Sequence, residues 1–321
     1  MSNIATVAAD FRPKIRNPRT GLKMSATLAT VFTILGHTVL GFEQPIVYVM
    51  IALLTGYFCA IVFESIDAIS NSRSALFAGR GTFGMLDFLL SAHMTAITIS
   101  FLLYSNQQFW VLSFAVAAAI GSKYLFRVQE SGRLQHFLNP SNFGICLTLF
   151  LFRYTGLLPW NFSENTSRFA GWLLPIVILV LGFRLNLVFT RRIPLISAWL
   201  LTFLVQGTVR ALLYHAPIQS QLLPLTGVPM VLFTLYMITD PQTTPSSVSS
   251  QIAFGVGVGI GYAAFLELHI VYGMFYSVLV VASVRGILIA VRSRQASRKL
   301  SLRSEKDLIP YSVGVGIRNV P

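Results

Sequence analysis

The sequence has few charged residues for its length. Charged side chains make up 11% of 321 residues, and hydrophobic side chains make up 54%. Soluble globular domains carry about 25% charged residues, so this composition excludes an ordinary soluble domain. Helices satisfy their own backbone hydrogen bonds in lipid. We therefore expect an all-α integral membrane protein.

Cysteine is also scarce. Cys59 and Cys146 both lie inside apolar runs, where cysteine acts as a packing residue. No CxxC pair or Cys/His cluster occurs, so the sequence predicts no metal site. It also has no nucleophile–base pair and no paired carboxylates at a workable spacing. A standalone hydrolytic enzyme is therefore not predicted.

Acidic residues are outnumbered, with 11 acids against 24 Lys and Arg. The basic residues gather at both ends of the chain, which predicts a basic segment 1–21, a membrane domain 22–291 and a basic, flexible tail 292–321. Basic ends flanking an apolar body indicate cytoplasmic termini. We expect a multi-pass protein of the cell (inner) membrane, with the lipid bilayer as its environment. The ends lack interleaved aromatic residues, so nucleic acid is not a predicted partner.

Spanning helices need about 20 mostly apolar residues. This rule gives about ten predicted spans, an even number that agrees with two cytoplasmic termini. Their ranges are 22–40, 45–63, 85–104, 107–126, 142–158, 169–189, 193–213, 221–239, 251–266 and 269–291.

Two polar motifs with a proline interrupt these runs: "LNPSNFG" (138–144) and "ITDPQTTP" (238–245). Asn139 suits a helix N-cap with Pro140 as the first helical residue, and Asp240 with Pro241 repeats the pattern. A helix start after a break offers free N–H groups to a phosphate, a carboxylate or a polarised carbonyl. The alternative is that both are ordinary caps at cytoplasmic loops. The span count places both motifs on one side, so either one is re-entrant or they are not symmetry mates.

Other ionisable residues lie within the apolar body, where each is a functional candidate. Snorkelling or interfacial solvation accounts for Lys123, Arg184, Arg210 and Glu267, which are near predicted span ends. Asp87 and His93 are deeper but face different sides of a helix, so they do not form a simple proton relay. We expect structural roles for His93 and His37.

The ninth predicted span contains four glycines in "FGVGVGIGY" (254–262). They form two overlapping GxxxG pairs, Gly255 with Gly259 and Gly257 with Gly261. Such pairs allow another helix to approach the backbone closely. Close helix packing is the favoured interpretation, and close approach of a flat ligand is the alternative.

From residue 123 to about 290 the chain resembles the RnfD/NqrB-type membrane subunits. The resemblance rests on "KYLFRVQESGRLQHFLNPSNFG" (123–144), on "MITDPQTTPSS" (237–247) with its glycine-rich helix, and on "RRIPLISAW" (191–199). Short relatives associated with enediyne biosynthesis are similar as well. The resemblance implies two five-helix repeats, as in urea-channel-like folds. It also implies a pocket around Asn139, Pro140, Asn142, Thr239, Asp240, Pro241 and Thr243.

The RnfD/NqrB-type subunits carry FMN on a threonine that follows the first motif. Here the only threonine between Pro159 and Thr190 is Thr166, outside any matching motif. Covalent FMN is therefore not expected, whereas a noncovalent flavin stays open. We favour transport of a small solute or metabolite through a broken-helix site. The alternative is a flavin- or quinone-binding subunit of a membrane electron-transport complex. Partner subunits, a homo-oligomer or a scaffold role are left open.

Overall fold

The computed structural model describes residues 18–130, 132–157 and 168–308. The remainder of the predicted terminal segments, together with Thr166, lies outside the described residues. The long helices are α2 (Pro18–Thr38), α3 (Ile46–Ser70), α4 (Gly81–Leu102), α5 (Phe109–Leu125), α6 (Pro140–Leu151), α7 (Arg168–Arg184), α8 (Ile193–Leu213), α11 (Val248–Glu267) and α12 (Gly273–Leu308).

Each of the ten predicted segments coincides with helical structure, but ten full spans are not shown. Within the described part of the chain, five helices are long and apolar enough to cross a membrane, and a sixth is gained if one bent pair counts as one span. The five are Ile46–Ser70, Gly81–Leu102, Ile193–Leu213, Val248–Glu267 and Gly273–Gln295. The fold is therefore a helical bundle with the apolar surface of a membrane protein.

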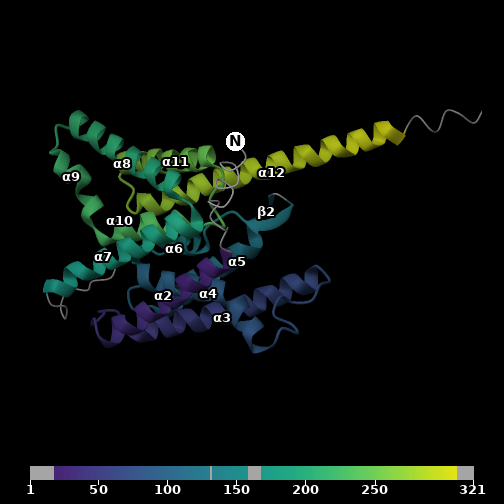
Figure 1. Cartoon of the computed structure of the whole chain (residues 1–321), viewed down its shortest axis with the longest axis horizontal. Coiled ribbons are helices and arrows are strands. Elements are labelled where there is room, and N and C mark those ends of the chain that lie inside the picture. Colours follow the sequence, from purple (N-terminus) through teal and green to yellow (C-terminus); the bar gives the residue numbers. More distant parts are fainter. Residues whose placement is uncertain (1–17, 131, 158–167, 309–321) are drawn as a thin grey trace, which may run out of the picture.

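Helices from the two ends of the chain form two groups (Figure 1). In the first group α3 contacts α4 and α5, α2 contacts α4, and α5 contacts α6. In the second group α11 packs between α8 and α12. α6 also contacts α12, so it joins the groups. Small residues permit the closest approach, since a Cβ on Gly144 would lie 2.3 Å from the Ala115 carbonyl oxygen.

The eighth predicted span, 221–239, is broken. It contains α9 (Ile218–Leu222), a 3₁₀ turn η2 (Leu223–Thr226), α10 (Val228–Leu232) and a π-helix η3 (Phe233–Met237). Its two parts are bent by 66°. Pro224 and Pro229 lie at the break, where a proline removes a helical hydrogen bond.

A second π-helix, η1 (Leu185–Thr190), follows α7. Asn186 in η1 is fully buried and donates to the carbonyl oxygens of Gly182 and Leu235 at 2.9 and 2.7 Å. Its side chain therefore ties η1 to η3. Backbone groups released by a π-helix need such partners inside a membrane bundle.

Two short antiparallel strand pairs accompany the helices, which the all-α expectation omitted. β1 (Leu103–Tyr104) pairs with β4 (Gly156–Leu157), and β2 (Arg127–Glu130) pairs with β3 (Arg133–His136). The second pair connects α5 to α6. It lies directly before Asn139 and therefore next to the first motif.

The last helix extends past residue 291 into the predicted tail. α12 continues without interruption to Leu308 and projects from the body of the molecule (Figure 1). The first part of the tail is therefore helical rather than a flexible segment.

Candidate functional site

The first motif forms a capped helix start, as predicted. Asn139 is the N-cap of α6, and its Oδ1 accepts from the Asn142 backbone N–H at 3.1 Å and from the Ser141 hydroxyl at 2.8 Å. Pro140 occupies the first turn, where its missing N–H costs nothing. The Asn139 side chain is 8% exposed, so this cap is buried.

The second motif does not start a helix at Asp240, contrary to the prediction. Asp240 instead organises a turn: its carboxylate accepts from Gln242 N and Thr243 Oγ1, both at 3.1 Å, and its carbonyl accepts from Thr244 N at 3.1 Å. α11 begins at Val248, capped by the Ser247 hydroxyl. The reason is Pro245, which disfavours a helical Thr244 and would lack a donor within a helix begun at Pro241.

The two motifs are in direct contact. Asn139 Nδ2 lies 3.3 Å from the Met237 carbonyl oxygen and 3.4 Å from Asp240 Oδ2. About a hundred residues separate the two in the sequence. The contact places both motifs in one region of the bundle rather than on opposite faces of it.

Two arginines complete this region. Arg192, the N-cap residue of α8, donates to the carbonyl oxygens of Pro245, Pro241 and Thr244 at 2.5, 3.2 and 3.3 Å. Arg285 on α12 donates to the Thr243 carbonyl oxygen at 3.4 Å. We call Asn139, Arg192, Asp240, Thr243 and Arg285 the polar node.

The start of α6 lies within the bundle rather than at its edge. The Phe137 ring sits against α12 at Gly286, where a Cβ would be 2.1 Å from it. Asn142 Nδ2 donates to the Phe275 carbonyl oxygen at 3.1 Å. Phe275 and Gly286 are about three turns apart on α12, roughly 16 Å at 1.5 Å per residue. The chain therefore runs along α12 from Gly286 toward Phe275 as α6 begins.

The length of α6 also differs from that of a spanning helix. Its 12 residues rise only about 18 Å, too short to cross the core alone. The apolar run predicted a span over 142–158, but the helix ends at Leu151 and the chain turns into β4. α6 is therefore a half-length helix whose N-cap, Asn139, is buried against the second motif.

The remaining predicted pocket residues divide into three groups. Thr243 and Asn142 are buried and bonded to the second motif and to α12, respectively. The Thr239 hydroxyl donates to the Leu235 carbonyl oxygen at 2.8 Å, so it satisfies its own helix rather than the node. Pro140 and Pro241 set backbone conformation, and the Pro241 carbonyl accepts from Arg192.

Charge balance distinguishes the node from an open anion site. The starts of α6 and α8 both adjoin the turn at Asp240, and helix N-termini carry partial positive charge. Asp240 supplies the negative charge for them within the protein itself. The node is therefore largely self-satisfied, although Arg192 Nε is buried without a hydrogen-bond partner among the described residues.

Other charged candidates form separate structural networks. Glu64 is 1% exposed and binds Arg73 at 2.6 Å, and Asp67 binds both Arg73 and Arg127. Arg210 pairs with Glu267 at the other ends of α8 and α11. Lys123, predicted to snorkel, instead donates to Ser91 and Thr95 on α4.

The deeper candidates are paired as well. His93 lies 2.8 Å from the Thr30 hydroxyl and 2.6 Å from the Tyr57 hydroxyl, so it joins α2, α3 and α4. Asp87 pairs with Arg19 and Lys23. His37 Nδ1 lies 2.8 Å from the Thr33 carbonyl oxygen one turn earlier. The contacts of these residues are those of structural groups.

The four glycines of α11 divide between two neighbours. A Cβ on Gly255 would lie 2.6 Å from the Leu195 carbonyl oxygen, and one on Gly259 would lie 2.4 Å from Thr202 Cγ2, both on α8. Gly257 and Gly261 face Val281 and Ser277 on α12. These glycines thus set the spacing of α8, α11 and α12, the helices that carry Arg192 and Arg285.

Sequence reasoning alone misses Arg192. It stands in "RRIPLISAW" and resembles an ordinary basic loop residue, although the following helix start and the shortage of nearby acids point to a buried role. Arg285 is recognisable as a charged residue in an apolar run, but its partners are not. Both arginines find carbonyl acceptors far along the sequence, which no local pattern encodes.

Comparisons with known proteins add no assignment: neither the protein-family models nor the curated proteins gave a match to this chain. The site is therefore interpreted from its own geometry. Across the described ranges, no group of three or more His, Cys, Asp or Glu side chains could hold a metal ion. The chemistry of the node is that of amide, carboxylate, hydroxyl, guanidinium and backbone groups.

Proposed function

We propose that this protein transports a small polar solute or metabolite across the cell (inner) membrane, through the polar node at the start of α6. One observation carries this proposal: a half-length helix begins inside an apolar bundle, and its capping amide contacts a carboxylate from a second motif. Discontinuous helices of this kind form solute sites near the membrane midplane in transporters. Polar groups buried within an apolar membrane bundle are costly unless they serve a site.

The arrangement of helices supports a further part of the proposal, two five-helix repeats with ten membrane segments. In the first repeat, α2 to α6, the second helix contacts the third and fourth, and the fourth contacts the fifth. The second repeat, α7 to α12, has the same pattern when α9, α10 and their turns count as its third member. An odd number of helices per repeat inverts the second relative to the first.

The proposed repeat accounts for both motifs lying on the same side of the membrane. The first motif precedes the fifth helix of its repeat, whereas the second precedes the fourth helix, α11. These positions are not equivalent by symmetry, and inversion brings both to the same side. The basic residues at the two ends of the chain favour the cytoplasm for that side and for both termini.

Solute binding tests the proposal even while the substrate is unidentified. We would measure the thermal unfolding midpoint of the purified protein with a panel of small polar metabolites. A cognate solute raises the midpoint by mass action. Asp240→Asn and Asn139→Ala should abolish this shift and also uptake into proteoliposomes. Glu267→Gln, which removes a distant ion pair, is the matched control and should retain both. Normal uptake by both node variants would show that the site assignment is wrong.

A redox function is the second candidate, favoured by the contact between the two motifs that resemble RnfD/NqrB-type subunits. Under this alternative the node holds a flavin or quinone noncovalently, and the chain works with partner subunits in an electron-transport complex. The visible absorption spectrum of the purified protein distinguishes the two. A stoichiometric flavin band that survives detergent exchange would replace transport as the proposed function.

A further inference from the structure

The hairpin before α6 stands between the two groups of helices. β2 and β3 pair from Arg127 opposite His136 to Glu130 opposite Arg133. Their turn includes Gly132 at φ +77°, a conformation that favours glycine. The chain then passes through Phe137 and Leu138 directly into Asn139. We call residues 127–136 the hairpin.

The base of the hairpin is attached to the first group of helices. Arg127 donates to Asp67 on α3 at 2.9 Å and to the Lys123 carbonyl oxygen at 2.7 Å. Its guanidinium also lies 4.6 Å from the ring centroid of Tyr124 on α5. Three contacts of different kinds hold this end.

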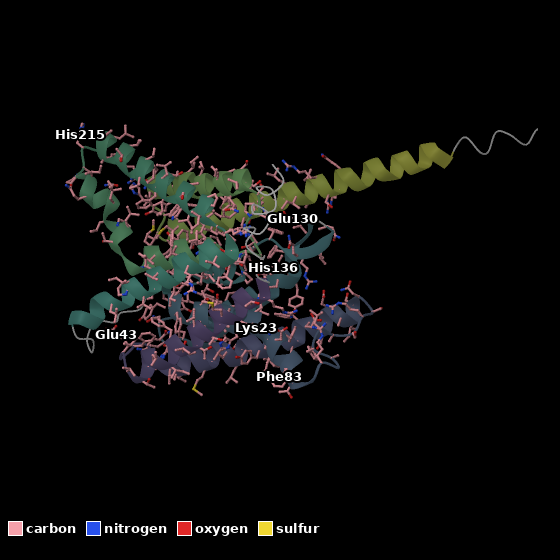
Figure 2. All side chains as sticks on the ribbon, in the orientation of Figure 1. Lys23, Glu43, Phe83, Glu130, His136 and His215 are labelled. Atoms are coloured by element: carbon pink, nitrogen blue, oxygen red, sulfur yellow. The ribbon has the colours of Figure 1, made fainter. Side chains whose placement is uncertain are left out.

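An ion pair joins the tip of the hairpin to the second group, where β2 also packs against α12. Glu130 accepts two hydrogen bonds from Arg285 on α12, at 2.7 and 2.9 Å. Figure 2 shows Glu130 beside α12 and His136 further toward the centre of the molecule. Arg285 also donates to Thr243 in the polar node. The same guanidinium therefore joins the hairpin tip to the node.

An aromatic contact joins the residue after the hairpin, Phe137, to α12. The Phe137 ring lies on Gly286 so closely that a Cβ there would overlap it. Phe126 packs against Phe137 and Phe143 with ring centroids 6.1 and 5.2 Å apart. These rings lie between the hairpin and the start of α6.

The two attachments differ in strength. Partly exposed ion pairs contribute about 0–1 kcal/mol, and both Glu130 and Arg285 retain some exposure, at 31% and 18% of their side chains. Separation of the tip from α12 therefore breaks one weak ion pair and the packing of β2 on α12, while the contacts between the helices themselves are kept. The base, with its additional backbone bond and ring contact, would stay in place.

We propose that the hairpin is a movable cover over the polar node, closed by the Glu130–Arg285 ion pair and hinged at the Arg127–Asp67 attachment. This inference rests on the proposed function for its purpose: access of a polar solute to the node from one side. Its geometry does not depend on which solute is carried.

Cysteine labelling tests the cover directly. The background is Cys59→Ala with Cys146→Ala, which removes both native thiols. Ser141→Cys then places a reporter in the first turn of α6, where Ser141 is 8% exposed. The measured quantity is its modification rate by a small, membrane-impermeant methanethiosulfonate. Glu130→Gln should raise that rate about fivefold, which corresponds to about 1 kcal/mol.

Matched variants separate opening from general loosening. Glu267→Gln removes the Arg210–Glu267 pair at the other ends of α8 and α11 and should leave the rate unchanged. Equal acceleration by Glu130→Gln and Glu267→Gln, or none by Glu130→Gln, would overturn the proposal.

A second variant covers the case in which Glu130→Gln does not fold. Gly286→Ala displaces the Phe137 ring and should also accelerate labelling, whereas an unchanged rate counts against the cover. Labelling is measured without solute, so its failure would leave the binding test unaffected. If the hairpin opens as expected but the protein binds no solute, the proposal of a cover stands and the proposal of transport fails.

Discussion

Asn139 and Asp240 are each followed by proline, but Asn139 caps α6 at once whereas Asp240 folds a turn that ends before α11 begins at Val248. The helix start presents an amide and backbone donors. The turn presents a carboxylate and the carbonyl oxygens of Pro241, Thr243, Thr244 and Pro245 as acceptors. The two motifs are therefore complementary rather than equivalent.

Because of this difference, both arginines bind the second motif rather than the first. Arg192 and Arg285 come from helices of the second group and bind carbonyl oxygens of the turn, whereas Asn139 bonds to both the turn and its own helix. The turn should thus depend on long side chains from elsewhere. The helix start should depend mainly on its own cap.

Arg192→Met should have the largest effect on stability. Methionine fills similar space but leaves three carbonyl oxygens without their donor, two of them in buried bonds, which costs about 3 kcal/mol in the free energy of unfolding. Denaturant unfolding in detergent measures the loss. Arg192→Lys keeps the charge with fewer donors and should lose about half as much. A stable Arg192→Met variant would show that the turn is held by its own sequence.

Asn139→Ala should have the next largest effect, about 2 kcal/mol, because it removes a buried cap and the bonds to Met237 and Asp240. Ser247→Ala removes the exposed cap of α11 and should cost about 1 kcal/mol. The same unfolding measurement compares them. Equal losses would mean that the link between motifs adds nothing to the cap.

Local chemistry made part of this structure predictable. Hydropathy located the helical segments, and the Asn-Pro pattern located the α6 cap, because both signals act within a few residues. The Asp240 prediction failed since Pro245, five residues later, blocks a helix begun at Pro241. The contact of the α6 start with the second motif, the role of Arg192 and the π-helices joined by Asn186 depend on contacts across about 50 residues or more.

Asp240→Asn should have a smaller effect on stability, about 1 kcal/mol. The amide oxygen can replace one of the two carboxylate acceptors of Gln242 and Thr243, and the Thr244 N–H still bonds to the backbone carbonyl, so most of the turn persists. The negative charge beside the helix starts is lost. Unfolding in detergent again gives the value. A loss as large as that of Arg192→Met would mean that the carboxylate, rather than the arginine, holds the turn.

The smallest expected effect concerns pH and the hairpin. Burial lowers the pKa of His136 to about 4, while Asp240 acts to raise that pKa and Lys123 and Arg127 act to lower it. Within the described residues its Nε2 is buried without a hydrogen-bond partner. An opened hairpin exposes the ring and returns its pKa to about 6.5. Protons then bind the open form better, so acid favours opening, whereas above about pH 6.5 both forms are neutral and pH has no effect.

Labelling of the cysteine at position 141 should therefore increase about fourfold between about pH 7.5 and about pH 6. Rates are expressed relative to Ser74→Cys, an exposed position in the loop after α3, which corrects for the ionisation of the thiol. His136→Gln keeps a polar side chain that does not titrate in this range, so it should remove the increase. An increase that persists in His136→Gln would assign the pH response to another group. A flat profile in the parent would place His136 in the same surroundings in both states, so that the hairpin would have to open without moving β3.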